Sequence, residues 1–169
     1  MFIRSRRRVR RLLRQIAGRD LWTVREIRTP KARMGSSNAE WCIATGEGLG
    51  RDSVVYCAGV GTDVTFDVAL IERYGCDVNA VDPTPRSIDW ISRQKLPDQF
   101  KFYPLGFAGH DGVLEFSPPD KADRVSYSTA REGSTIVTLP VQRIRTFARN
   151  RGHSRIDLVK LDIEGSEYA

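Results

Sequence analysis

Hydrophobic positions along this chain change their period twice within one stretch, residues 53–82. Val54–Ala58 is a short continuous run of β-branched and small apolar residues, which is typical of a buried strand. Gly59 and Gly61 follow directly, and a second apolar run ends at Asp82. In between, apolar residues recur at helical spacing, at Val64, Val68, Ile71 and Tyr74. The stretch therefore predicts a βαβ unit with a tight glycine turn after its first strand.

The rest of the chain continues the alternation of strands and helices. Helical spacing predicts helices at residues 86–94 and 142–149. Short apolar runs predict strands at residues 22–28, 40–45, 100–105, 113–116, 135–141 and 156–162. Glycine-rich or polar text at residues 106–112 and 120–134 predicts loops. The order indicates an α/β fold with a mostly parallel sheet of four core strands, to which residues 113–116 and 135–141 add a hairpin.

Charge is distributed unevenly along the 169 residues. The net charge is +6, but residues 1–33 carry 12 basic and 2 acidic residues, which leaves 15 basic and 19 acidic residues for the remainder. We therefore predict a basic N-terminal arm at residues 1–33 and one domain at residues 34–169. Within the arm, residues 1–19 have the pattern of a short basic amphipathic helix. It either makes a weak contact with anionic membranes or nucleic acid, or it is a solvated helix or a disordered lead-in. We favour the second alternative because the apolar stripe is thin, and we expect no specific nucleic-acid partner.

The three cysteines, Cys42, Cys57 and Cys76, have no metal-ligand spacing, so no metal site is predicted. An odd number of cysteines, two of them in or beside predicted buried strands, indicates reduced thiols and a cytoplasmic location. No apolar run approaches the length that spans a bilayer, and no secretory signal is apparent.

The chemistry of the βαβ unit points to a nucleotide-like cofactor. Glycines after a parallel strand let backbone N–H groups approach a ligand, and an acid at the end of the next strand can accept ribose hydroxyls. Val64 occupies the position of the third glycine of the dinucleotide fingerprint, which makes nicotinamide or flavin binding the lesser alternative. No Gly-Lys-Ser/Thr follows the turn, which argues against a nucleoside triphosphatase. S-adenosylmethionine fits the remaining pattern best.

Three segments of the chain resemble the FkbM-type S-adenosylmethionine-dependent methyltransferases. They are Val-Tyr-Cys-Ala-Gly-Val-Gly-Thr-Asp-Val-Thr-Phe-Asp from Val55, Ala-Val-Asp-Pro-Thr-Pro-Arg-Ser from Ala80, and Asp-Leu-Val-Lys-Leu-Asp-Ile-Glu-Gly-Ser-Glu from Asp157. The last is similar to the family's Lys-x-Asp-x-Glu-Gly-x-Glu signature. The resemblance covers residues 34–169. It implies the Rossmann-like class I methyltransferase sandwich and O-methylation of a hydroxyl on a sugar, polyketide or other small molecule.

The resemblance also implies roles for individual residues. Gly59 and Gly61, with Val60 and Asp63 in the same loop, would bind the methionine end of the cofactor, and Asp82 would bind the ribose. Phe107 and Ala108 would lie beside the adenine. Asp162 and Glu164 would face the transferred methyl group, and either can accept the hydroxyl proton; alternatively, Asp162 only orients the cofactor and Glu164 only caps a helix. Cys57 departs from the family pattern, which commonly has an acid there that helps hold the amino-acid part of the cofactor.

Four further residues have competing interpretations. Trp41 is expected in the core rather than against a substrate, His110 and His153 are expected at the solvent-exposed surface, and Lys160 is expected to extend along the strand to solvent.

The class I fold usually has seven strands in the order 3-2-1-4-5-7-6, and the chain supplies the first four. We therefore expect a C-terminally truncated domain, an exposed sheet edge that favours self-association, and, as an alternative to an enzyme, a non-catalytic binding module.

Overall fold

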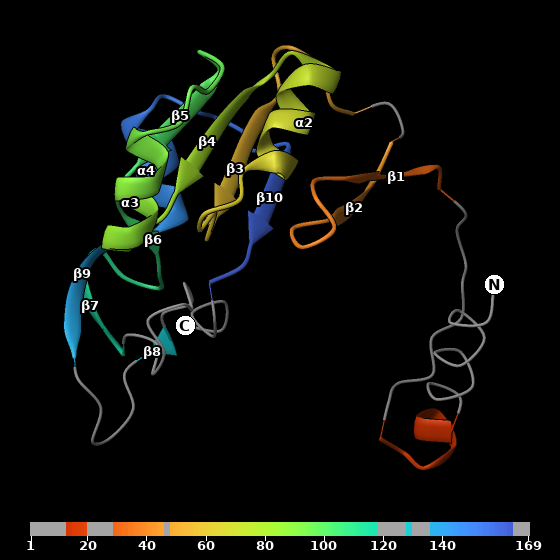
Figure 1. Cartoon of the computed structure of the whole chain (residues 1–169), viewed down its shortest axis with the longest axis horizontal. Helices are drawn as coiled ribbons and strands as arrows, with labels where there is room; N and C mark the ends of the chain where they lie inside the picture. Colours follow the sequence, from red (N-terminus) through yellow and green to blue (C-terminus); the bar gives the residue numbers. More distant parts are fainter. Residues whose placement is uncertain (1–12, 20–28, 46–47, 118–127, 130–135, 164–169) are drawn as a thin grey trace.

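The computed structural model describes residues 13–19, 29–45, 48–117, 128–129 and 136–163. Its central element is a four-stranded parallel sheet in the order β5-β4-β3-β10 (Figure 1). The strands are β3 (Val54–Ala58), β4 (Asp77–Val81), β5 (Phe100–Tyr103) and β10 (Leu158–Leu161). These strands were predicted, and their spatial order is that of the first four strands expected from the family resemblance.

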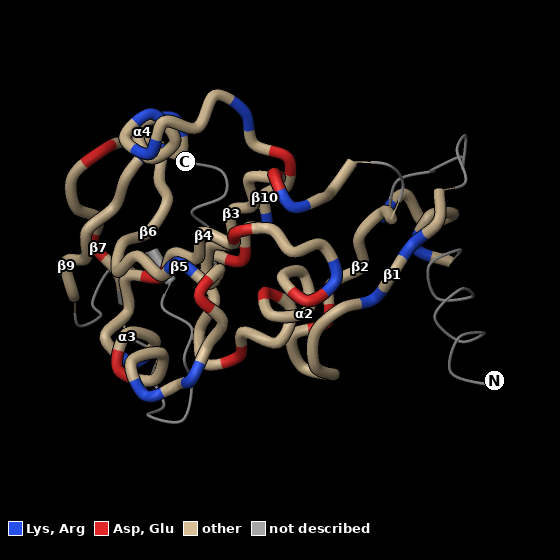
Figure 2. The backbone as a smooth tube through the Cα atoms, turned by 90° about the horizontal axis from the view of Figure 1, so that it is seen from above, with Lys and Arg blue, Asp and Glu red and all other residues tan. Residues whose placement is uncertain are grey.

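Helices cover both faces of this sheet. Figure 2 shows α2 (Thr65–Tyr74) and α3 (Pro85–Ser92) on one side and α4 (Ile144–Asn150) on the other. The first side buries Leu70 and Ile91 against Val55, and the second packs the Phe147 ring edge-on against Tyr56, with centroids 5.1 Å apart. The described residues therefore form three layers, which confirms the predicted α/β fold.

The end of α2 and the start of α3 follow local chemistry. α2 ends at Gly75, which has a φ of 68° and donates its N–H to the carbonyl of Ile71 at 2.7 Å. α3 begins with Pro85 in its first turn, where the missing N–H costs nothing, since the first N–H groups of a helix have no intrahelical partner. Gly75 therefore ends α2 where the chain returns to the sheet, and Pro85 starts α3 directly after β4.

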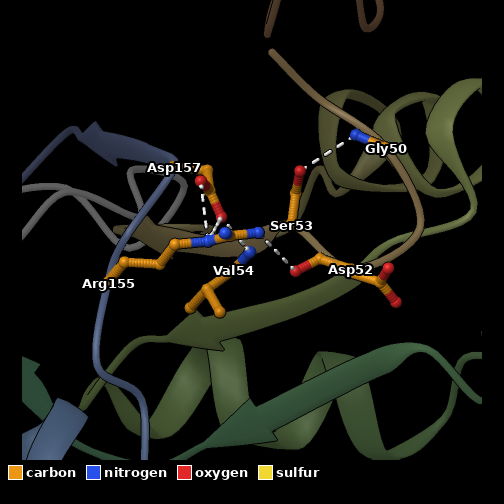
Figure 3. Close-up of polar contacts among 6 residues, drawn as sticks. All are labelled: Gly50, Asp52, Ser53, Val54, Arg155 and Asp157. Carbon is orange, nitrogen blue, oxygen red and sulfur yellow. Dashed lines mark hydrogen bonds and ion pairs between the residues drawn. The ribbon is translucent and has the colours of Figure 1, made fainter.

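Side chains at the start of β3 and β10 lock the two strands in register. Asp157 accepts the backbone N–H of Val54 at 2.8 Å, and Arg155 forms an ion pair with Asp157 at 3.2 Å (Figure 3). Arg155 also reaches the carbonyl of Asp52 at 3.5 Å, and the Ser53 hydroxyl accepts the Gly50 N–H at 2.9 Å. The bonds between Asp157 and Val54 and between Arg155 and Asp52 each join residues 103 positions apart, and so fix the register of β10 against β3.

A second, mixed sheet lies at one end of the first. It consists of β6 (Gly106–Phe107), β9 (Val137–Gln142), β7 (Gly112–Ser117) and β8 (Ser128–Thr129) in the order β6-β9-β7-β8. The predicted hairpin is present as β7 and β9, but the prediction of loops at residues 106–112 and 120–134 was wrong at β6 and β8. Two-residue strands carry no hydrophobic period, and β6 exists because Gly106 pairs with Val141, 35 positions later along the chain.

An antiparallel hairpin stands before the βαβ unit. β1 (Lys31–Met34) pairs with β2 (Trp41–Ala44), and the hairpin packs on α2, where the Trp41 and Phe66 rings lie 6.3 Å apart. β2 was predicted, whereas β1, which crosses the boundary expected between residues 33 and 34, was not. Of the predicted N-terminal helix, residues 13–16 are helical, and its earlier part lies outside the described residues, as does the strand predicted at residues 22–28.

The expected buried face of α2 was partly right. Val64 and Ile71 are buried, and Val68 and Tyr74 pack against the same core. The helix also buries Phe66, Asp67 and Leu70. Phe66 meets Trp41 of the hairpin, which the βαβ pattern does not include, and Asp67 lies beside Cys57 of β3. At the other end of the sheet, β10 is an edge strand among the described residues, as expected, and its Val159 is 43% exposed.

Candidate active site

A cavity of about 400 Å³ lies at the carboxyl ends of β3, β4 and β10. Its described wall is formed by residues 38–41 of the hairpin, 58–63 after β3, 81–84 after β4, residues 106, 107 and 116, and residues 160, 162 and 163. The carboxyl ends of parallel strands meet at one edge of a sheet, which is where α/β proteins bind their ligands. The cavity is therefore the first candidate for a functional site.

Gly59 and Gly61 form the floor of this cavity with backbone alone. Both have positive φ, 72° and 58°, which side chains on other residues rarely allow. Gly59 donates its N–H to the carbonyl of Val81 at 3.0 Å. A Cβ on Gly59 would stand 1.8 Å from the carbonyl oxygen of Asp162, so only glycine lets the end of β10 approach the turn.

Asp82 follows β4 and fixes the glycine turn. Its Oδ2 accepts the backbone N–H of Gly61 at 2.9 Å, and its Oδ1 accepts the N–H and the hydroxyl of Thr84 at 2.9 and 2.6 Å. The side chain is 5% exposed. Since a carboxylate offers about four acceptor positions, Asp82 can accept one further hydrogen bond, from a ligand hydroxyl, without losing these three.

Asp63 ties the hairpin to the start of α2. It accepts hydrogen bonds from the Ser36 hydroxyl at 2.6 Å and from the Thr65 N–H and hydroxyl at 3.0 and 2.6 Å. Partial burial raises the pKa of Asp63, but the bonds from Ser36 and Thr65 outweigh it, so the pKa lies below its ordinary value. The carboxylate is therefore charged at neutral pH beside the cavity.

Lys160 brings a cation to the wall of the cavity. It is 8% exposed, and its Nζ donates to the carbonyl oxygens of Gly59 at 2.9 Å and Ala58 at 3.4 Å. The Nζ lies 5.4 Å from the centroid of the Trp41 ring and 4.0 Å from Asp162 Oδ2. The expectation that Lys160 extends to solvent was wrong, because Trp41 and the turn enclose it. Trp41 packs on Phe66, as expected for a core residue, and it also lines the cavity.

Comparison with protein families adds the deciding observation. Residues 53–169 match the Methyltransferase FkbM domain, which is more than half of the chain. The chain belongs to the FkbM methyltransferase domain family. Searches of curated proteins and of solved structures found no match.

The FkbM domain brings most of the predicted site residues together. Those that line the cavity are Gly59, Val60, Gly61, Asp63, Asp82, Phe107 and Asp162. Cys57 and Ala108 do not line it: Cys57 is fully buried, and Ala108 packs on the core of the second sheet. Glu164 lies outside the described residues.

Cys57 of the FkbM domain lies in the core beneath α2 and does not line the cavity. Burial, and then the neighbouring Asp67 carboxylate, raise the pKa of the Cys57 thiol well above its ordinary value, so the thiol is uncharged. Asp67 is 1% exposed, and its Oδ1 has no hydrogen-bond partner among the described residues. Burial raises the pKa of Asp67 to about 6, against the opposing effects of the Cys57 hydrogen bond and the Lys160 charge.

Several residues of the cavity wall were not found from the sequence. Residues 38–40 join the site because the hairpin folds over α2, and Phe116 joins it from the second sheet. Lys160 carried a usable signal, because a lysine inside an apolar strand two residues before an acidic strand end is unusual.

The histidines of the FkbM domain lie away from the cavity. His110 is exposed as expected, but His153 is half-buried and its Nδ1 lies 2.7 Å from the Tyr56 hydroxyl. Among the described parts of the chain, no helix is long and apolar enough to cross a bilayer.

Proposed function

We propose that this protein is an S-adenosylmethionine-dependent methyltransferase that methylates a hydroxyl group of a small molecule, such as a sugar. The observation that carries the proposal is the charge of the cavity in a chain of the FkbM family. Four carboxylates, those of Glu40, Asp63, Asp82 and Asp162, and one ammonium, that of Lys160, line its described wall.

The charge pattern separates the candidate cofactors. Dinucleotides and nucleoside triphosphates carry negative phosphates, which would face these carboxylates across a partly enclosed space, where charges are weakly screened. Glu40 is paired with Arg33, but the other three acids lie around the glycine turn. S-adenosylmethionine has a net positive charge and no phosphate, so it fits this cavity better than any of those ligands.

The residues of the wall suggest how the cofactor is held. Residues 59–61 and Asp63 bind its methionine end, Asp82 accepts a ribose hydroxyl, and Phe107 lies beside the adenine. S-adenosylmethionine supplies an electrophilic methyl group on a sulfonium. Asp162, at the end of β10, accepts the proton of the substrate hydroxyl, a role that Glu164 shares in the proposal.

The fold supports the same assignment at a coarser level. The order β5-β4-β3-β10 and the helices on both faces fit a Rossmann-like class I methyltransferase. We extend the proposal to residues 34–169 as the methyltransferase domain and residues 1–33 as a basic arm. We place the reaction in the cytoplasm, because the three cysteines are free thiols.

Calorimetry with the full chain tests the cofactor. We expect S-adenosylmethionine and S-adenosylhomocysteine to bind, and NADH and ATP not to bind. Asp82→Ala should weaken cofactor binding by about 10-fold or more through the lost ribose contact and the loosened turn, whereas Asp89→Ala, an exposed acid on α3, should not.

Transfer of a labelled methyl group to a panel of hydroxyl compounds then tests the reaction, with Asp162→Asn as the variant expected to slow transfer more than binding. Tight binding of NADH or ATP in place of S-adenosylmethionine would refute the proposal, and binding without transfer would favour a non-catalytic binding module.

A further inference from the structure

Lys160 is a buried cation, and the described residues provide hydrogen-bond acceptors for only two of its three N–H groups. It lies on β10 in register with Cys57 of β3, and its side chain follows that face of the sheet towards the glycine turn. An ammonium removed from water is costly unless its N–H groups find acceptors. Two of the three do so, at the carbonyl oxygens of Gly59 and Ala58.

The remaining donor has no carboxylate within hydrogen-bond distance among the described residues. Asp162 Oδ2 forms an ion pair with Nζ at 4.0 Å, which is too long for a hydrogen bond. Asp63 and Asp67 interact with Lys160 through their charges. Lys160 is also the one Lys or Arg in the described wall of the cavity. The third N–H of Lys160 is therefore positioned to donate a hydrogen bond to a negatively charged group of a ligand in the cavity.

The strand order decides which end of a ligand reaches Lys160. Asp82 follows β4, and β10 lies two strands away, on the far side of β3. Neighbouring strands are about 4.8 Å apart, so the ends of β4 and β10 are separated by about 10 Å. A ligand whose ribose is at Asp82 has its opposite end at β10, beside Trp41 of the hairpin and the carbonyls that Lys160 holds.

We propose that Lys160 binds the α-carboxylate of S-adenosylmethionine through its third N–H, an inference that rests on the proposed function. The ammonium then has two tasks: its bonds to the carbonyls of Gly59 and Ala58 hold the turn, and its charge fixes the amino-acid end of the cofactor. The Trp41 ring keeps water from the ammonium, which strengthens its attraction for a carboxylate.

Two ligands that differ only in the carboxylate test this proposal. S-adenosylmethionine and decarboxylated S-adenosylmethionine share the adenosine, the sulfonium and the amino group. In calorimetry with the full chain, we expect Lys160→Met to weaken binding of S-adenosylmethionine by about 10- to 100-fold, as expected for loss of a charge-assisted hydrogen bond. The decarboxylated ligand should lose only what the two bonds that hold the turn contribute, less than about 3-fold, and its retained binding also shows that the variant is folded.

Matched variants complete the experiment. Lys101→Met removes an exposed lysine of β5, whose Nζ donates to the carbonyl of Asp98, and should leave both affinities unchanged. Lys160→Arg keeps the charge and should retain part of the preference for the carboxylated ligand. An equal loss for both ligands with Lys160→Met would mean that Lys160 only holds the turn, and no loss for either would also overturn the proposal.

The two proposals fail in different ways. A wild-type protein that binds neither ligand refutes the proposed function. One that binds both ligands with equal affinity leaves the cofactor assignment standing and overturns the role of Lys160.

Discussion

Replacing Gly59 with alanine perturbs the point where three strands meet. The N–H of Gly59 bonds to the end of β4, its carbonyl accepts from Lys160, and its Cα faces the carbonyl of Asp162 after β10. The variant therefore tests whether the end of β10 packs on the turn as described.

The expected magnitude has two parts. A φ of 72° costs a residue with a Cβ about 1–2 kcal/mol relative to glycine. The new Cβ would also stand 1.8 Å from the Asp162 oxygen, where contacts under 3.0 Å are essentially never seen, so the backbone has to move by more than an ångström. Overpacking of this kind costs about 1–3 kcal/mol, which brings the total to about 2–5 kcal/mol.

Gly152→Ala is the matched control. Gly152 has a similar φ of 70°, but a Cβ there meets nothing within 4 Å. Its substitution should cost only the backbone part, about 1–2 kcal/mol. The difference between the two variants therefore isolates the contact with Asp162.

Urea unfolding followed by circular dichroism measures both variants. At equal slopes, the shift of the midpoint gives the change in unfolding free energy. In a thermal scan, each kcal/mol should lower the midpoint by about 2–4 °C for a protein of this size. If Gly59→Ala costs no more than Gly152→Ala, the end of β10 does not press on the turn and the described cavity is wrong.

Three further predictions concern buried or bridging polar groups. The pKa of Asp67 in the folded state is about 6, above its ordinary 3.8, so between these two pH values the folded state holds a proton that the unfolded state releases. The unfolding free energy should therefore fall by on the order of 3 kcal/mol as the pH rises from below 3.8 to above 6. Asp67→Asn should flatten that slope in urea titrations at several pH values, and an unchanged slope would contradict the assignment. Asp63→Ala should lower the unfolding free energy by about 1–2 kcal/mol, because the hydrogen bonds at the start of α2 and from Ser36 are lost. The control Asp89→Ala removes an exposed acid and should cost about 0.5 kcal/mol or less. Equal costs for the two variants would count against the hydrogen bond that joins Asp63 to the hairpin. Tyr56→Phe should cost about 1 kcal/mol, and a double-mutant cycle with His153→Ala should detect coupling between the two side chains, whose absence would exclude their hydrogen bond.

Local pattern was sufficient for the elements that build the parallel sheet. β3, β4 and β5 were predicted because each is a short apolar run followed by glycine, proline or an acid, and α2 and α3 because apolar residues recur at helical spacing between them. The strand ends that carry Gly59, Asp82 and Asp162 follow from the same runs.

Pairings between distant segments could not be predicted from local pattern. β6 and β8 are two residues long, and β1 is a strand only because β2 lies beside it. The burial of Phe66 on α2 was missed for the same reason, since the hairpin whose Trp41 packs on it comes from an earlier part of the chain. Such elements depend on a partner that no neighbouring residue specifies.

By itself, the sequence determined the α/β fold, the glycine turn and the acids at the ends of the strands, because periodicity and turn chemistry act over a few residues. The tertiary structure alone decided what surrounds them. It places Cys57 in the core and encloses Lys160 between Trp41 and the carbonyl of Gly59. It also buries Asp67, one oxygen of which has no hydrogen-bond partner in the part of the chain that the structure describes. The physical reason is register: Lys160 meets Cys57 103 positions away because β10 pairs with β3, and burial, charge and pKa in the site follow from that pairing.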